Sequence, residues 1–580
     1  MRSKKKYPLT YFLKGYGRQS ILAPLFKLLE ALFDLFVPLV VAEIIDVGIA
    51  QNDIPFILRC CVLLIALGVI GLVCSITAQW FAAEAAIACA TSMRHTLFQH
   101  IQTLDFSQMD TLGGSTLITR LTSDINQVQN GLNMALRLFL RSPFIVLGSV
   151  VMAFTIDSRV ALVFVATVPL LSLIVFGIMR LTSPMYKKTQ GQLDRVLRLT
   201  RENLTGVRVV RAFGREDEEV RQFDQENQQL TRIQLRVGRL SALMNPMTYV
   251  VVNLASVAVL YVGGLQVEGG ILLSGDVYAL INYMSQILVE LVKLANTIVL
   301  VSKAMACTSR IQSVLDLEPQ MAFSEQPVDL GGPEAIGFTD VSLTYADADG
   351  ESLQDLSFSV RRGETFGIIG GTGSGKSSVV NLIPRFYDAT AGQVRLFGHP
   401  IQDYPKEQLR HTVGIVPQRA QLFSGTIRSN LLWGNENATD EELWAALETA
   451  QAAEFVRGKP LGLDEEVEQG GRNLSGGQRQ RLIIARALVK RPEILILDDS
   501  ASALDFATDA ALRRALKALP GDLTVVIVSQ RTSSLQHADQ ILVLEDGHPA
   551  GLGNHQQLME TCGVYREIYD SQFQRGGESA

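Results

Sequence analysis

The stretch FGIIGGTGSGKSS, Phe366 to Ser378, decides the fold of the C-terminal half of this chain. It reads as an apolar strand, then a glycine-rich turn, then the start of a helix. Gly370 to Ser377 fits the pattern GxxxxGK[ST], in which glycines let backbone N–H groups converge on phosphate oxygens. We therefore predict a phosphate-binding loop between a strand and a helix of an α/β domain. The predicted phosphate-binding residues are Gly370, Gly371, Thr372, Gly373, Ser374, Gly375, Lys376, Ser377 and Ser378.

A second apolar strand ends in two carboxylates, Asp498 and Asp499, within ILILDDSASALD, Ile494 to Asp505. A carboxylate at the tip of a buried strand suits Mg²⁺ binding, directly or through a water molecule. In the loop, Lys376 is placed to reach the β- and γ-phosphates and Ser377 the metal ion. An apolar strand ending in aspartate is common, but after a phosphate loop it indicates the metal side of a nucleotide site.

The N-terminal half has a different character, because long apolar runs alternate there with basic segments. Each run can supply the roughly 20 residues that cross a bilayer as a helix. The predicted spans are approximately 19–48, 58–90, 132–155, 159–180, 244–264 and 270–301. In the last span, Asp276, Glu290 and Lys293 interrupt the apolar face and are expected to face other helices or a cavity. The polar residues that are candidates to line a path or to pair with one another are Glu43, Gln79, Glu84, Arg137, Arg141, Asn282, Gln286 and Glu290.

The distribution of Lys and Arg predicts the orientation in the membrane. The first 18 residues and the segment 181–243 are basic, whereas the connections 49–55, 156–158 and 264–270 contain no Lys or Arg. The positive-inside rule then places both termini in the cytoplasm, with six crossings between them. Apolar residues recur at helical spacing in 91–130 and 185–243, so we expect long helices that project beyond the membrane.

Composition excludes several other functions. The net charge of −6 is small, which argues against nucleic acid as the main partner. Six cysteines show no metal-binding spacing, and most lie in apolar stretches, which favours buried thiols over disulfides. The basic N-terminus is not followed by a short apolar core with a small-residue cleavage site, so no cleaved signal peptide is expected.

The string LSGGQRQR, Leu474 to Arg481, identifies a family. It closely resembles the signature of ATP-binding cassette proteins. Membrane helices followed by one cassette resemble a half-transporter of the exporter type (type IV). The resemblance implies an α-helical six-helix transmembrane domain (1–318), a linker (319–335) and an α/β P-loop nucleotide-binding domain (336–580). ATP and Mg²⁺ are the implied ligands, and the implied signature residues for a partner's ATP are Leu474, Ser475, Gly476, Gly477 and Gln478.

Other segments match the same family. Tyr345 is similar to the aromatic residue that stacks on adenine, and Gln418 to the glutamine that senses Mg²⁺. Glu468 resembles part of an acidic loop that crosses between domains. Segments 106–124 and 202–216 resemble the intracellular coupling segments. The implied metal ligands are Ser377, Gln418 and Asp498, and the loop that faces the partner cassette is Ser502, Ala503, Leu504 and Asp505.

Two positions depart from the family pattern. Asp499 replaces the glutamate that positions the attacking water. Its carboxylate lies roughly one ångström short of where the glutamate carboxylate would be, and a misplacement of this size can slow a reaction about 100-fold. Gln530 replaces the switch histidine and cannot carry charge. With Gln418, these are the implied catalytic positions. We therefore expect this chain's own pocket to bind ATP but to hydrolyse it slowly, while its intact signature completes a partner's pocket.

The resulting prediction is a transport-coupled ATPase subunit of a bacterial heterodimeric multidrug-type exporter. It would lie in the cytoplasmic membrane, with a second half-transporter that carries the usual glutamate and histidine, and move amphipathic small molecules or peptides outward. Three alternatives remain open: an exporter-fold importer of iron chelates, a membrane-bound ATP-gated regulator without transport, and a homodimer with two slow sites. The sequence does not identify the substrate.

Overall fold

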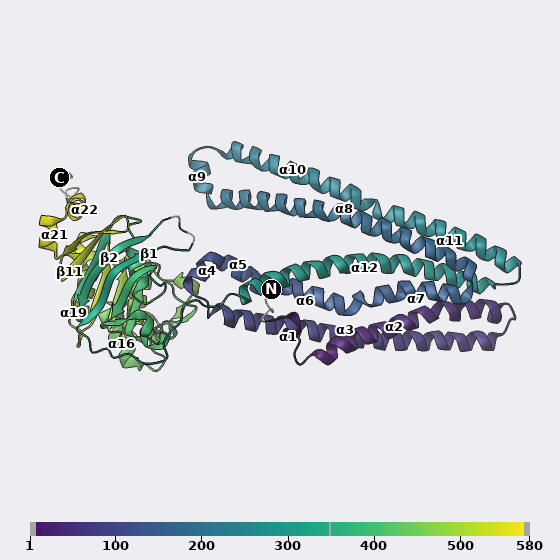
Figure 1. Cartoon of the computed structure of the whole chain (residues 1–580), viewed down its shortest axis with the longest axis horizontal. Helices are drawn as coiled ribbons and strands as arrows, with labels where there is room; N and C mark the ends of the chain where they lie inside the picture. Colours follow the sequence, from purple (N-terminus) through teal and green to yellow (C-terminus); the bar gives the residue numbers. More distant parts are fainter. Residues whose placement is uncertain (1–6, 347, 349, 574–580) are drawn as a thin grey trace. The chain divides into compact units, whose positions relative to one another are not determined.

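The chain folds into two compact units, seen in a computed structural model that describes residues 7–346, 348 and 350–573 (Figure 1). The first unit comprises Met1–Gln102 and Ser115–Leu317. The second comprises Glu318–Ala580 together with Thr103–Gly114. Segment 103–114 lies within the predicted membrane domain 1–318 in the sequence, and its contacts group it with the second unit.

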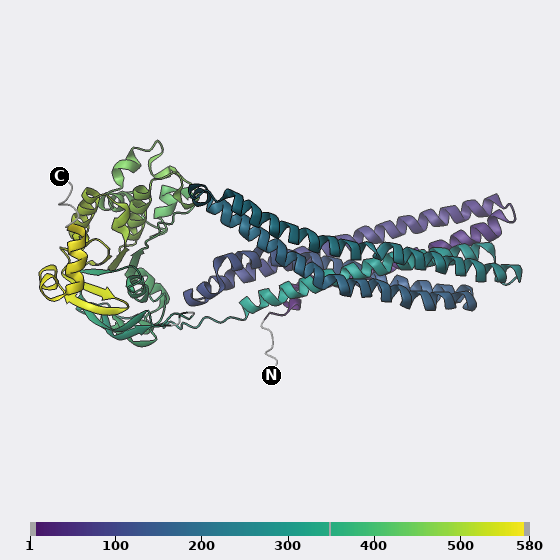
Figure 2. The same cartoon turned by 90° about the horizontal axis from the view of Figure 1, so that it is seen from above.

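The first unit is entirely helical, and its long helices run alongside one another (Figures 1 and 2). Helix α2 packs on α3, α8 packs on α10 and α11, and α12 packs on α6, α7 and α2. The elements are α1 (Leu9–Phe12), α2 (Gly17–Glu43), η1 (Ile44–Ile49), α3 (Ile54–Ile101), α5 (Gly114–Thr119), η2 (Arg120–Asp124), α6 (Ile125–Met134), η3 (Ala135–Phe139), α7 (Arg141–Ile156), α8 (Ser158–Thr205), α9 (Val207–Ala212), α10 (Glu216–Ala242), α11 (Met244–Glu268) and α12 (Ser274–Leu315).

Within the described residues, five helical segments are long and apolar enough to cross a membrane. They are Ile54–Ile101, Gly114–Ile156, Ser158–Thr205, Glu216–Glu268 and Ser274–Leu315, and they contain nearly all of the last five predicted spans. The first predicted span, 19–48, is also helical, but it is not among the five. The reason is that Lys27, Glu30 and Asp34 interrupt the apolar sequence of α2.

The predicted helical extensions are only partly continuous. Segment 185–243 is helical as predicted, in α8, α9 and α10, and α8 alone has 48 residues, roughly 72 Å of helix. The pattern in 91–130 predicts one long helix, but α3 ends at Ile101. Asp105 then caps the short helix α4 (Phe106–Leu112), and Gly113 ends α4 with a φ of 73°, which glycine adopts readily.

The second unit is built around a six-stranded sheet of order β12-β11-β3-β10-β9-β6, in which only β12 is antiparallel. Because the other five strands are parallel, Gly370, Asp498 and the residues after Val528 meet at one edge. The strands are β3 (Thr365–Gly370), β6 (Val413–Val416), β9 (Ile494–Asp498), β10 (Thr524–Val528), β11 (Gln540–Glu545) and β12 (His548–Gly553).

Smaller sheets and short helices complete this unit. A four-stranded antiparallel sheet has the order β2-β1-β4-β5, and β7 (Gly425–Thr426) pairs with β8 (Glu466–Val467). The first four strands are β1 (Glu334–Leu343), β2 (Leu353–Arg361), β4 (Ala391–Leu396) and β5 (His399–Pro400). The helices used below are α13 (Lys376–Leu382), α18 (Gly476–Val489), α19 (Phe506–Lys517) and α22 (Gly563–Phe573).

Two hydrophobic cores hold the six-stranded sheet between them. Leu495 and Leu497 of β9 pack into one core, while Ile494 and Ile496 pack into the other, and all four are nearly inaccessible to solvent. Successive side chains of a strand point to opposite faces, so a strand that is covered on both faces must be apolar at every position. This explains the unbroken run ILIL before the two aspartates.

Candidate nucleotide site

The predicted phosphate-binding loop connects β3 to α13, so strand, turn and helix follow one another in the expected order. Lys376 begins α13, and its Nζ donates to the carbonyl oxygens of Gly370 at 2.9 Å and Gly371 at 2.5 Å. Gly375 has a φ of 92°, and a Cβ there would lie 2.6 Å from Cδ2 of Leu353. Only glycine therefore fits this position, and the two bonds from Lys376 hold its ammonium group against the loop backbone.

A cavity of about 420 Å³ opens beside the loop and is of a size typical of ligand sites. Five of the nine residues predicted to bind phosphate line it, namely Gly373, Gly375, Lys376, Ser377 and Ser378, whereas Gly370, Gly371, Thr372 and Ser374 do not. Four further residues, absent from the predicted set, complete the lining. They are Glu351, Ser352, Asp546 and Gly547. No local pattern marks them, because they come from the connections that precede β2 and β12.

The charges in the site influence one another. Burial raises the pKa of Asp498 and the neighbouring Asp499 raises it further, while Lys376 and a hydrogen bond from Ser377 act in the opposite direction. Burial lowers the pKa of Lys376, against the attraction of Asp499 and Asp498. An added cation would relieve the repulsion between the two carboxylates. With the Ser377 hydroxyl and Asp498, the site offers the hard oxygen ligands that Mg²⁺ prefers, and we find that ATP and Mg²⁺ fit these residues.

Asp499 lies directly after β9, and its backbone has a φ of 46°, a region in which aspartate is enriched. The amide Nε2 of Gln418 donates to Oδ2 of Asp499 at 3.3 Å. The backbone carbonyl oxygen of Asp499 accepts from the Ser502 hydroxyl at 2.7 Å. The structure thus brings together Gln418 and Asp499, which are 81 residues apart in the sequence.

Gln530 follows β10, two residues after the strand ends, and its side chain is exposed. The side chain of Gln572, in α22, bonds to the backbone at Gln530 and at Thr532. Its Nε2 donates to the Gln530 carbonyl at 2.7 Å, and its Oε1 accepts from the Thr532 N–H at 2.9 Å. No local pattern predicts this clamp, because Gln572 lies 40 residues beyond Thr532 in the chain.

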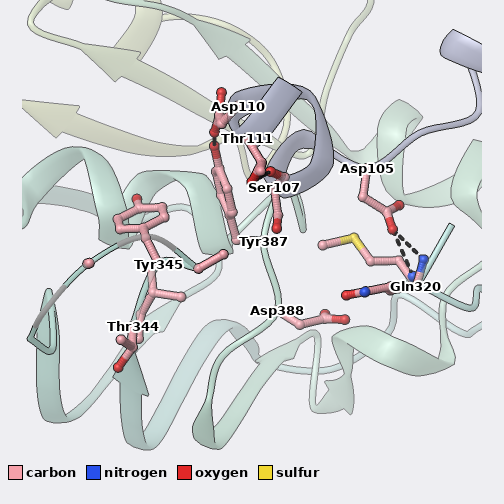
Figure 3. A pocket seen from close by; sticks show the side chains of 13 residues that line it. Asp105, Ser107, Asp110, Thr111, Gln320, Thr344, Tyr345, Tyr387 and Asp388 are labelled. Carbon is pink, nitrogen blue, oxygen red and sulfur yellow. Dashed lines mark hydrogen bonds between the residues drawn. The ribbon is translucent and has the colours of Figure 1, made fainter. Parts of the chain in front are cut away.

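A second cavity, of about 490 Å³, lies beside Tyr345 (Figure 3). The Tyr345 hydroxyl donates to Oγ of Ser378 at 3.1 Å, so the tyrosine is tied to the helix of the phosphate loop. The Tyr387 and Tyr345 rings pack edge to face, with the ring centres 5.0 Å apart. Tyr345, predicted to stack on adenine, therefore lies in the wall of this cavity and contacts the helix that follows the phosphate loop.

Helix α4 forms another wall of this cavity (Figure 3). The Tyr387 hydroxyl donates to the Asp110 carboxylate, and burial together with this bond raises the pKa of Tyr387. Asp105 accepts from the backbone N–H groups of Gln320 at 2.6 Å and Met321 at 3.1 Å. Through these contacts, part of the predicted coupling segment 106–124 is held within the nucleotide-binding unit.

Replacing Tyr387 by phenylalanine is expected to loosen α4. A hydrogen bond to a charged group stabilises by about 1.5–3 kcal/mol, so amide hydrogen exchange in 106–112 should become at least about tenfold faster. Tyr404→Phe is the matched control, because that buried hydroxyl bonds to the Leu396 carbonyl instead. Unchanged exchange in 106–112 would show that the Tyr387 bond does not hold the helix.

The signature residues lie at the start of α18. Ser475 caps this helix: its Oγ accepts from the Gln478 N–H at 3.3 Å, and its own N–H donates to Oε1 of Gln478 at 3.0 Å. Gly476 has open space around its Cα, whereas a Cβ on Gly477 would lie 3.2 Å from the Ala503 carbonyl oxygen. Leu474 differs from the other four, because its side chain is buried in the core.

The predicted partner-facing loop lies next to the signature. Ser502, Ala503 and Leu504 follow β9, and Asp505 caps α19 by accepting from the Thr508 N–H at 2.9 Å. In the described residues, no hydrogen bond joins the signature to the phosphate loop. The structure therefore presents the phosphate loop and the signature as separate parts of this unit.

Comparison with known proteins places both halves of the chain in the same group. The model for the ABC transporter transmembrane region matches residues 20–291, and the ABC transporter model matches residues 353–502. An uncharacterised ABC transporter ATP-binding protein of Mycobacterium tuberculosis is 35% identical, over 97% of both chains. A similar protein of Bacillus subtilis, YfiB, is 36% identical, over 98% of this chain and 99% of its own.

Two further matches extend the comparison. An ATP-dependent lipid A-core flippase of Chromobacterium violaceum is 28% identical, over 97% of this chain and 96% of its own. Among solved structures, a bacterial Atm1-family ABC exporter with ATP bound aligns with a TM-score of 0.81. That alignment covers 96% of this chain and 99% of the exporter chain at 24% identity. At 24% identity, the similarity to this solved structure shows that the fold is shared.

Proposed function

This chain belongs to the ABC transporter family, and from that premise we propose that it is one half of an asymmetric, ATP-driven exporter. In this proposal the second half is a different chain with the usual glutamate and histidine. The pocket around Lys376 binds ATP and Mg²⁺ but hydrolyses ATP slowly. The signature at Ser475–Gln478 completes the pocket of the partner, where most hydrolysis takes place.

One observation carries this proposal: two hydrolytic positions are altered in the same chain that keeps its signature. Asp499 is one methylene shorter than glutamate, and its carboxylate already accepts a hydrogen bond from Gln418. Gln530 can donate and accept hydrogen bonds, but it cannot take up a proton. A pocket with these two residues lacks a well-placed acceptor for the proton of the attacking water.

The chemistry of each remaining residue follows from its place. Lys376 neutralises the β- and γ-phosphates, and the loop N–H groups orient them. Mg²⁺, when bound, would be held by Ser377 and Asp498, with Gln418 nearby, and would offset the charge on the phosphates. Tyr345 provides a face for adenine. At the signature, Ser475 and the N–H groups at the start of α18 offer donors to an anion on the partner.

The proposal includes a place and a direction for transport. The domains span 1–318 and 336–580, with the linker 319–335 between them. The first of these crosses a bacterial cytoplasmic membrane six times, with both termini in the cytoplasm. Closure of two cassettes on ATP would move the helical extensions and turn the membrane cavity outward. Relatives named as lipid A-core flippases support an amphipathic substrate.

The purified chain alone is expected to hydrolyse ATP at most at about one hundredth of the rate of the assembled pair, because its own pocket lacks the water-positioning carboxylate. Isolation of the tagged chain from its native membrane should also bring down a second half-transporter of similar size. The measurement is steady-state ATPase of the single chain and of the pair. Brisk turnover by the single chain would overturn the asymmetric scheme.

A further inference from the structure

A charged cavity of about 390 Å³ lies inside the first unit, between α2, α7 and α12. Its position falls well inside the predicted spans 19–48 and 132–155, where charges are costly and tend to mark a function. The residues that give it its character are Asp34, Arg141, Ile145, Gln286, Glu290 and Lys293. The phosphate site and the signature lie in the other unit, so this cavity belongs to neither.

Arg141 is the centre of an ion network that surrounds the cavity. Its guanidinium donates to Glu290 at 2.7 Å and to Asp34 at 2.8 Å, and it lies 3.9 Å from Glu30. Lys293 adds a bond of 2.9 Å to Glu290, and Lys27 one of 2.5 Å to Glu30. Three cations and three anions make up this network, so their formal charges cancel.

The members of the network differ sharply in exposure. The side chains of Glu290, Arg141, Glu30 and Lys27 are between 5% and 13% exposed. Those of Asp34 and Lys293 are 45% and 44% exposed, and both line the cavity. The network therefore presents one anion and one cation to the cavity.

Two buried polar atoms near the cavity have no partner among the described residues. They are Oε1 of Gln286 and Nε of Arg141. A buried polar group without a hydrogen bond is destabilising, and each such atom calls for an explanation, of which a bound polar group is one. A polar ligand group in this cavity would supply partners for this acceptor and this donor.

We propose that this cavity binds the headgroup of a zwitterionic amphiphile, with Asp34 facing the ligand's cation and Lys293 facing its anion. The proposal rests on the proposed export function and specifies the chemical class of the substrate. Gln286 and Arg141 supply the additional polar contacts to the headgroup.

Charge balance within the membrane favours a zwitterion over an ion of one sign. The network is neutral without a ligand, and a singly charged headgroup would leave one charge uncompensated in a medium of low dielectric. A zwitterion keeps the cavity neutral and satisfies both exposed groups. The volume admits a headgroup and the first part of a carbon chain, and Val37, Ile145 and Val289 provide an apolar wall.

The test compares three probes with the same twelve-carbon chain: dodecylphosphocholine, dodecyl phosphate and dodecyltrimethylammonium. Binding of each radiolabelled probe to the full-length assembled transporter is measured by equilibrium dialysis without ATP. The uncharged detergent dodecyl maltoside keeps competing headgroups out of the sample. Dodecylphosphocholine should bind about tenfold more tightly than dodecyl phosphate or dodecyltrimethylammonium, each of which carries charge of one sign only. Equal affinity for all three probes, or preference for a probe with charge of one sign, would overturn the proposal.

Two variants separate the roles of the exposed groups. Asp34→Asn should weaken dodecylphosphocholine binding about tenfold and remove the preference over dodecyl phosphate. Lys293→Gln should remove the preference over dodecyltrimethylammonium. Glu268→Gln and Lys303→Gln are the matched controls, because these exposed residues lie outside the cavity and should bind like the wild type. Thermal unfolding confirms that each variant is folded. Variants that bind like their controls would contradict the proposal.

This measurement is independent of hydrolysis. Selective binding in a transporter that shows no ATP-driven transport would support the proposed headgroup site and contradict the proposed export function. Absence of selectivity in an active asymmetric exporter would contradict the proposed headgroup site and leave the proposed export function unaffected.

Discussion

Replacing Gly477 by aspartate is expected to lower ATP turnover of the assembled exporter at least about 100-fold. In the proposed scheme, this glycine completes the only competent pocket, that of the partner. A side chain here would meet the Ala503 carbonyl oxygen, 3.2 Å from its Cβ, and the carboxylate would repel the phosphates. Steady-state ATPase of the pair, with the variant in this chain only, measures the effect.

The control for this variant is Gly563→Asp. Gly563 is an exposed glycine of the same unit, and a Cβ added there would meet no atom within 4 Å. This control should leave turnover unchanged, and both variants should unfold at temperatures close to that of the wild type. If the Gly477 variant kept more than about a tenth of the activity, the signature of this chain would not serve the main hydrolytic pocket.

Restoring both altered positions, with Asp499→Glu and Gln530→His, is expected to raise hydrolysis at this chain's pocket about 100-fold. The longer carboxylate recovers the roughly one ångström that aspartate lacks, and histidine can carry charge next to the γ-phosphate. Combining these changes with Gly477→Asp silences the partner's pocket. ATPase regained in that background is then turnover at the pocket of Lys376.

The two single variants are the internal controls. Each should regain less ATPase activity than the double variant, because the two groups act on the same water and phosphate. Glutamate is also less suited than aspartate to the φ of 46° at position 499, so a small loss of thermal stability is expected. No gain in ATPase in the folded double variant would mean that Asp499 and Gln530 are not what limits this pocket.

The sequence by itself determined the features that depend on local geometry. The run Phe366 to Ser378 contains every residue needed for a strand, a glycine turn and a helix start, so its conformation needs no distant partner. The run ILIL before Asp498 predicts a strand covered on both faces, which the two cores confirm. Apolar runs of sufficient length likewise predict membrane-spanning helices, because the length of a run and the spacing of its apolar residues can both be read directly from the sequence.

Only the tertiary structure decided which distant side chains meet. Tyr387 bonds to Asp110 across 277 residues, and this contact helps to group α4 with the second unit. Arg141 pairs with both Asp34 and Glu290. The charged residues that make α2 less apolar than the other spans are therefore part of one neutral network. Such pairings depend on how separate helices pack, and no local period or motif encodes the partner of a single charged side chain.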